Sequence, residues 1–181
     1  LLAPAHSLVA LLLYRKGDAR TRPTQEAFDQ VAAALKADGL LDRCVMAQID
    51  ALQKRYIAAL DGKDMRAWAD CFSQRDDASY ICRSAENEAN GWPMALMLDD
   101  CRARIEDRIM FITKIWVGTF QEYRTRHFLQ QVSSERDGDQ WRVRTHFSIE
   151  YTLDPNRTQL LAAGVYEDVV EFEDGEPVFV S

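Results

Sequence analysis

A hairpin signal between residues 124 and 151 constrains the fold of this 181-residue chain more than any other feature. Two alternating runs flank Asp137-Gly138, a dipeptide that suits the positive φ angles of a type I′ turn. A two-residue turn aligns three pairs on an apolar face: Phe128 with Phe147, Val132 with Val143, and Ser134 with Trp141. The other face then carries His127, Gln131, Glu135, Arg142, Arg144, His146 and Glu150. The pattern predicts a long hairpin with one core face and one charged face.

Helical patterns precede the hairpin. An apolar stripe predicts a helix that Asp42 caps and that ends at residues 61–63; its members are Val45, Ile49, Leu52, Tyr56 and Leu60. Asp64 then caps a short helix that carries Trp68. Upstream, Thr24 and Gly39 bound another helical pattern, and residues 8–13 form an apolar run. We therefore expect residues 1–40 to be a helical extension in front of a main domain spanning residues 41–181.

Further strands are expected between and after these elements. Residues 79–83 predict a strand, residues 86–91 a polar loop, and residues 109–116 a loosely alternating strand. Between the last two, Asp99 or Asp100 caps a helix running to about Arg108.

The last long strand covers residues 159–173, and Asp174-Gly175 turns it into a final strand. The order of elements predicts an α+β fold in which a curved, mainly antiparallel sheet wraps around the N-terminal helices.

Composition excludes several classes of function. The net charge is −7 and the arginines are scattered among acids, which argues against non-specific nucleic-acid binding. The four cysteines form no C-x-x-C motif and, with three histidines, no zinc pattern, so we expect reduced thiols in a cytoplasmic protein. The apolar run at residues 8–13 is far shorter than the ~20 residues of a membrane span, so no membrane partner is expected.

Taken together, several segments resemble the small (β) subunit of aromatic-ring-hydroxylating dioxygenases, which has the NTF2-like or cystatin-like fold. The matching residues are Tyr56, Ala59, Asp61, Trp68, Phe72, Leu98 to Arg102, Glu106 to Ile109, Trp116, Arg126 to Phe128, the Asp-Gly hairpin, and Gly164 to Asp168. The resemblance covers about residues 43 to 181 and implies an NTF2-like cone, in which the curved sheet encloses the helices.

The resemblance also implies a partner. In this family of Rieske non-haem iron oxygenases, a large (α) subunit carries a Rieske [2Fe–2S] centre and a mononuclear non-haem iron. The small subunit carries no cofactor and supports an assembly that is commonly α3β3. We therefore expect a non-catalytic structural subunit in aromatic compound catabolism, which associates with the large subunit and with other copies of itself in a trimer.

The charged hairpin face supplies candidate interface residues: Arg126, His127, Arg142, Arg144, His146 and Glu150. His127 and His146 lie diagonally on one face in the predicted register, but the neighbouring arginines disfavour a bound metal ion. Contacts with another subunit and a solvated sheet face are the two readings that remain.

Asp168 and Tyr166 support an alternative function. Both lie on a strand face made otherwise of small and apolar residues. A carboxylate in an apolar cavity has a raised pKa and can act as a general acid or base. The chain would then be a standalone isomerase, dehydratase or cyclase acting on a small molecule inside the cone. The structural alternative is a salt bridge from Asp168 to Arg108 or Arg126.

Overall fold

A computed structural model describes residues 25–37, 39–117, 123–154 and 157–181. The helices are α2 (Gln25–Ala37), α3 (Leu40–Gly62), α4 (Met65–Ala69), α5 (Ala85–Ala89), α6 (Arg102–Met110) and the π-helix η1 (Phe111–Ile115). The strands are β1 (Tyr80–Cys82), β2 (Met97–Asp99), β3 (Arg124–Asp137), β4 (Gln140–Asp154), β5 (Arg157–Glu173) and β6 (Glu176–Phe179). The apolar run at residues 8–13 and the Thr24 cap lie outside the described residues.

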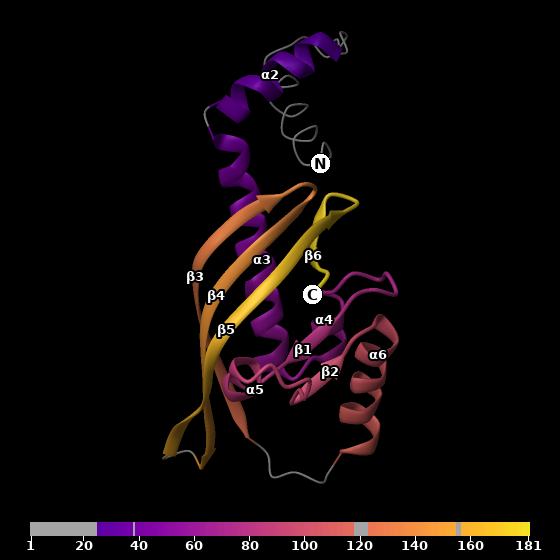
Figure 1. Cartoon of the computed structure of the whole chain (residues 1–181), viewed down its shortest axis with the longest axis vertical. Coiled ribbons are helices and arrows are strands. Elements are labelled where there is room, and N and C mark those ends of the chain that lie inside the picture. Colours follow the sequence, from indigo (N-terminus) through magenta and orange to yellow (C-terminus); the bar gives the residue numbers. More distant parts are fainter. Residues whose placement is uncertain (1–24, 38, 118–122, 155–156) are drawn as a thin grey trace.

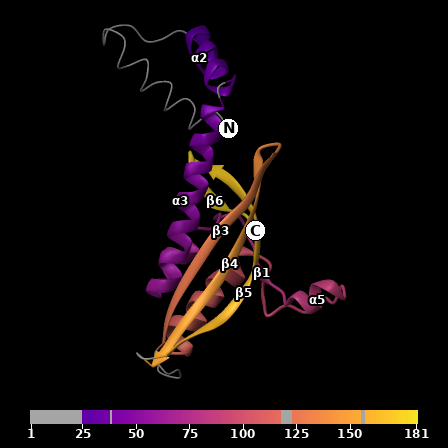
Figure 2. The same ribbon diagram turned by 90° about the vertical axis from the view of Figure 1, so that its left-hand side faces the viewer.

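One antiparallel sheet, in the order β3-β4-β5-β6, dominates the molecule (Figure 1). It is long and curved, and α3 runs along one of its faces, as the side view in Figure 2 shows. Strands β1 and β2 pair separately near α6. The predicted α+β class, with an open curved sheet around a helix, is confirmed.

Burial of the α3 stripe holds the helix on the sheet. Four of its predicted members, Val45, Ile49, Leu52 and Tyr56, are buried, and Leu60 packs beside them. They meet Trp141, Val143 and Val170 of the sheet, together with Trp68 and Phe72 from the segment after α3. Since each fully buried large apolar side chain contributes roughly 1.5–3 kcal/mol, this cluster dominates the stability of the fold.

The ends of the helices follow local rules. Lys63 adopts the left-handed conformation (φ 58°) and closes α3 at the predicted position. Asp64 caps α4 as predicted, since its carboxylate accepts a hydrogen bond from the amide of Ala67 at 3.0 Å. The start of α3 differs from the prediction. Gly39, with φ 63°, precedes the helix, so Asp42 lies within the first turn and is not the cap.

The hairpin forms, but its predicted register is wrong. The turn residues are Gly138 and Asp139, because Asp137 pairs with Gln140. Next to the turn the pairing is therefore two residues away from the predicted register, and a bulge at Val132 shifts it back by one, so that Leu129, and not Phe128, lies opposite Phe147. Shifting a strand by one residue exchanges its two faces. Beyond the bulge the odd-numbered residues of β3 therefore face α3, and Phe128 is 54% exposed.

Two other segments differ from the sequence prediction. Residues 85–89 form α5, capped by Ser84, where a loop was expected. Residues 109–115 continue α6 and form η1, where a strand was expected. Trp116, which follows η1, is 45% exposed.

Two of the segments that carry the resemblance, Leu98 to Arg102 and Glu106 to Ile109, contain residues that form structural ion pairs. Arg102 is buried at the start of α6, donates to the carbonyl of Ala69 at 2.8 Å and pairs with Glu106. Arg108 pairs with Asp99, with 3.0 Å between Nη2 and Oδ1. These charges join α6 to the end of α4 and to β2, so their role here is to position elements.

Candidate functional site

A pocket of about 100 Å³ lies inside the cone, between α3, β1 and β5. It is lined by Gln53, Tyr56, Phe72, Tyr80, Ile81, Leu129, Val165, Tyr166, Glu167, Asp168, Phe179 and Ser181. Both residues of the alternative catalytic pair, Asp168 and Tyr166, are therefore at one pocket. Ile81 is 43% exposed, so the pocket opens to solvent on its side.

Asp168 has an unusual environment. Gln53 donates one hydrogen bond to Thr145 at 2.7 Å and another to the Asp168 carboxylate at 3.3 Å. Burial raises the pKa of Asp168 to about 7, and the Gln53 hydrogen bond only partly opposes this. Among the described residues no arginine or lysine forms an ion pair with it.

The predicted salt bridge from Asp168 to Arg108 or Arg126 is wrong. Arg108 is occupied by Asp99, and Arg126 donates to the carbonyl of Thr125 at 2.7 Å. Asp168 thus remains a half-buried acid that faces a pocket and has a pKa of about 7.

Aromatic rings form most of the pocket wall. Tyr166 stacks on Phe147 with 4.2 Å between ring centroids and meets the edge of Tyr56 at 6.0 Å. Burial raises the pKa of Tyr56, Tyr80 and Tyr166 above the usual tyrosine value, so all three hydroxyls keep their protons at neutral pH. The wall therefore offers hydroxyl donors and ring surfaces, and no positive charge.

His127 does not lie on the charged face, so the prediction that grouped it with His146 is wrong. Its side chain is only 7% exposed, and Nδ1 is 2.6 Å from Asp61 Oδ1. Asp61 also accepts hydrogen bonds from the Thr125 hydroxyl at 2.9 Å and the His127 amide at 3.2 Å. These contacts join the end of α3 to the start of β3, which is a structural role.

The outer face of the sheet presents the other five candidate interface residues: Arg126, Arg142, Arg144, His146 and Glu150. Arg142 pairs with Asp137 at 2.8 Å, and Arg144 pairs with Glu167 at 2.9 Å. Phe128 and Val165 are exposed among them. The outer face is therefore a mixed surface, with apolar side chains set between ion pairs.

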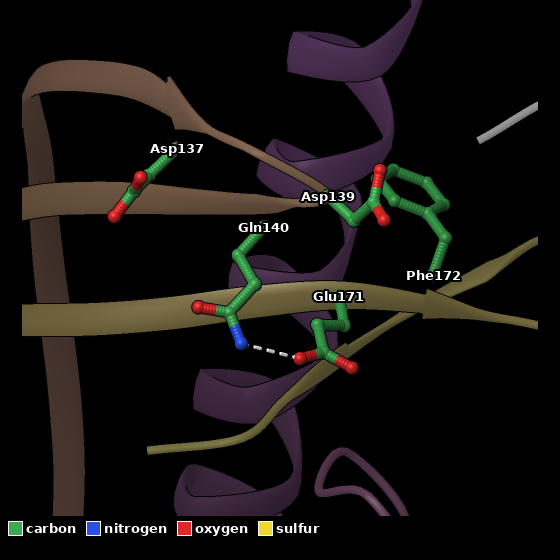
Figure 3. A pocket seen from close by; sticks show the side chains of 5 residues that line it. All are labelled: Asp137, Asp139, Gln140, Glu171 and Phe172. Atoms are coloured by element: carbon green, nitrogen blue, oxygen red, sulfur yellow. Dashed lines mark hydrogen bonds between the residues drawn. The ribbon is translucent and has the colours of Figure 1, made fainter.

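A second, larger hollow of about 460 Å³ lies at the tip of the hairpin (Figure 3). Asp137, Asp139 and Glu171 make it acidic. Burial opposes ionisation of Glu171, but hydrogen bonds from Gln140 and Arg75 outweigh burial and lower its pKa. Arg75 pairs with Glu171 and Arg142 pairs with Asp137, so two of the three acids that line this hollow already have a cationic partner.

The described residues do not fit the metal centres of an oxygenase. They contain no group of three or more His, Cys, Asp or Glu side chains placed to hold a metal ion. His127 and His146 are on opposite faces of the sheet, and Cys44, Cys71, Cys82 and Cys101 are free thiols. Within the same part of the chain, no helix is long and apolar enough to cross a membrane.

Gln53 and Thr145 were missed by the sequence reasoning. Gln53 lies within the apolar stripe of α3, between Leu52 and Tyr56, and Thr145 interrupts the inward run of Trp141, Val143 and Phe147. A polar residue on each of two apolar faces is the signal that could have paired them, because buried polar groups need partners.

An open antiparallel sheet curved around one long helix, with a pocket inside, defines an α+β cone of the NTF2-like class. The family model described as "Ring hydroxylating beta subunit" matches residues 55–181. The chain therefore belongs to the ring-hydroxylating beta subunit family, as the resemblance predicted. The catalytic metals of this family normally sit in the alpha subunit, which is the partner that membership implies.

Solved structures agree with this assignment. The chain is 25% identical to the beta subunit of a protein described as an aromatic-ring-hydroxylating dioxygenase from Novosphingobium aromaticivorans, with a TM-score of 0.68 over 78% of this chain and 88% of that one. It is 27% identical to the beta subunit of benzoate 1,2-dioxygenase from Burkholderia mallei, with a TM-score of 0.58 over 75% and 85% of the two chains.

A chain of naphthalene 1,2-dioxygenase with indole bound shares the fold at 18% identity, with a TM-score of 0.57 over 88% of this chain and 90% of that one. No curated protein sequence matches the chain.

Proposed function

We propose that this chain is the non-catalytic structural subunit of a multicomponent aromatic-ring-hydroxylating oxygenase, and that it assembles with its large subunit as α3β3. Family membership over residues 55–181 is the observation that carries this proposal. The chain would act in aromatic compound catabolism in the cytoplasm, where its free cysteines stay reduced. The Rieske cluster and the mononuclear iron would belong to the large subunit.

The outer sheet face is the surface we assign to subunit contacts. Exposed Phe128 and Val165 lie among the five polar residues Arg126, Arg142, Arg144, His146 and Glu150. Interfaces combine an apolar centre with a polar rim, and charge pairs on the rim fix the orientation of the partners. His127 is not included, because its side chain is engaged by Asp61.

The experiment is co-purification with the cognate large subunit, with a tag on that subunit only. Phe128→Glu places a charge at the proposed apolar centre and should reduce the amount of co-purified small subunit at least ~10-fold. Lys54→Glu, on the exposed side of α3, is the matched control and should leave assembly unchanged. If Phe128→Glu has no effect and a Leu96→Asp variant abolishes assembly, the contact surface lies instead around the exposed residues near β2.

A further proposal concerns the N-terminus. Residues 1–40 would form a helical extension separate from the main domain at residues 41–181, and would wrap around the large subunit. The helix α2 extends beyond the end of the sheet in Figure 1, which supports a reach towards a neighbour. Deleting residues 1–40 should weaken assembly in the same co-purification, and unchanged assembly would contradict the proposal.

The buried Asp168 favours a second candidate, a standalone isomerase, dehydratase or cyclase with Asp168 and Tyr166 as catalytic groups. Its pKa of about 7 suits a general acid or base. The test is turnover of a small ketone by the isolated chain. Activity that disappears in Asp168→Asn would support this second candidate, and an inactive isolated chain would leave the structural subunit as the function.

A further inference from the structure

We propose that the cone pocket is a binding site for one small uncharged phenol, whose hydroxyl group donates a hydrogen bond to Asp168. The phenol would bind inside the small subunit itself, against side chains of this chain alone. The proposal rests on the polar groups, the walls, the charge and the size of the pocket.

Asp168 provides the anchoring group. A carboxylate can accept about four hydrogen bonds, and among the described residues only the Gln53 amide donates to this one, at 3.3 Å. The Gln53 side chain is itself buried and held by Thr145, which is fully buried on β4. The carboxylate is therefore fixed in position and keeps capacity for another donor. A hydroxyl donor to a carboxylate forms one of the stronger hydrogen bonds in proteins.

The walls favour an aromatic ring. Tyr56 meets Phe72, Tyr166 and Phe179 edge-to-face, with ring centroids 6.2, 6.0 and 5.6 Å apart. Tyr80 adds a further ring from β1. Aromatic pairs prefer these edge and offset contacts, and a planar ligand can make the same contacts with the wall.

The charge of the pocket excludes anions. None of its lining residues is an arginine, lysine or histidine. Of its two acids, Glu167 pairs with Arg144, whereas Asp168 forms no ion pair among the described residues. A benzoate-type ligand would bring a second carboxylate close to Asp168, and like charges repel strongly in a site of low polarity. A phenol has a pKa near the ~10 of tyrosine and enters uncharged.

The volume limits the ligand to one ring. A cavity of ~150 Å³ holds benzene in another protein, and this pocket measures about 100 Å³ with an open side at Ile81. The hydroxyl group can reach Asp168 while the far edge of the ring remains at the opening. Two fused rings would clash with the walls.

The test is calorimetric titration of the full chain with phenol at about pH 8, where Asp168 is largely ionised. Saturable binding of one phenol per chain is expected. Toluene, which lacks the hydroxyl, and benzoate should each bind at least ~10-fold more weakly. Asp168→Asn should weaken phenol binding by the same factor, and Asp42→Asn, which removes an exposed acid in the first turn of α3, should not change it.

Ile81→Trp gives an independent measurement, because Ile81 is 43% exposed and a larger side chain there closes the opening without disturbing the core. It should abolish phenol binding, whereas Val132→Trp at the exposed bulge should not. Absence of saturable phenol binding to the wild-type chain would overturn the proposal. Equal binding of phenol and toluene, or equal binding by wild type and Asp168→Asn, would also overturn it.

Discussion

Replacing Asp168 by asparagine should stabilise the protein at neutral and alkaline pH. Burial holds the pKa of Asp168 at about 7, compared with 3.8 for an ordinary aspartate. Its charged form is therefore less stable in the folded chain than in the unfolded chain. Asparagine has nearly the same shape, can still accept from Gln53, and has no charge to bury.

The magnitude follows from linkage between protonation and folding. At ~1.4 kcal/mol for each pH unit, the difference between about 7 and 3.8 corresponds to about 4 kcal/mol. The folded chain holds the proton more tightly, so the destabilisation is fully present above pH ~7. It decreases as the pH falls, and it vanishes below pH ~3.8, where both states are protonated.

Urea denaturation at about pH 8 and about pH 4 measures this difference. The free energy of unfolding of Asp168→Asn should exceed that of the wild type by up to ~4 kcal/mol at the higher pH and by close to zero at the lower pH. Glu150→Gln, which removes an exposed acid on the outer face, should show no such dependence. A destabilised Asp168→Asn at about pH 8 would refute the reasoning, because it would mean that the carboxylate has a compensating partner.

Two further changes test the framework around the site. His127→Ala removes the inward imidazole and should lower the free energy of unfolding by ~1–3 kcal/mol. His146→Ala, on the exposed face, should change the free energy of unfolding by no more than ~0.5 kcal/mol. Equal effects of the two variants would contradict the assignment of faces. Gly164→Ala places a methyl group 2.9 Å from the Phe147 ring and should cost ~1–3 kcal/mol. In Gly62→Ala the added methyl group has no neighbour within 4 Å, so this variant should not destabilise the protein. Thermal unfolding of the two glycine variants measures the difference.

Local signals predicted most of the elements correctly. The apolar stripe from Val45 to Tyr56 predicted α3 correctly, because its helical spacing places these side chains on one face, and the sheet buries that face. The alternation along β4 identified Trp141 and Val143 as inward-facing, as they are. The Asp64 cap of α4 was predicted correctly, because a cap depends only on one side-chain oxygen and a backbone amide in the first turn of the helix.

The sequence predictions were wrong where the structure of a segment depends on a single residue or on the preceding element. The bulge at Val132 has no local signature, and it moved His127 to the inner face and Phe128 to the outer face. Residues 109–115 are rich in β-branched and aromatic side chains, which favour strands in isolation, yet they continue a helix that begins at Arg102.

The sequence predicted two residues of the candidate site but not the hydrogen-bond partner of Asp168. Asp168 and Tyr166 were identified because an acid on an apolar strand face is unusual. The partner of Asp168 could not be assigned, because Gln53 and Asp168 are 115 residues apart in the chain and meet only through packing. A nearby arginine is the more common partner of a buried acid, and the sequence offered several.

The central claim is that this chain is a structural subunit that binds a large, iron-carrying partner. Native mass spectrometry of the chain co-expressed with its cognate large subunit tests it most directly. We predict a single complex with equal numbers of the two subunits and a mass matching three of each, in which the iron remains with the large subunit after dissociation. A large subunit that assembles and is active without this chain, while the chain remains free, would contradict the claim.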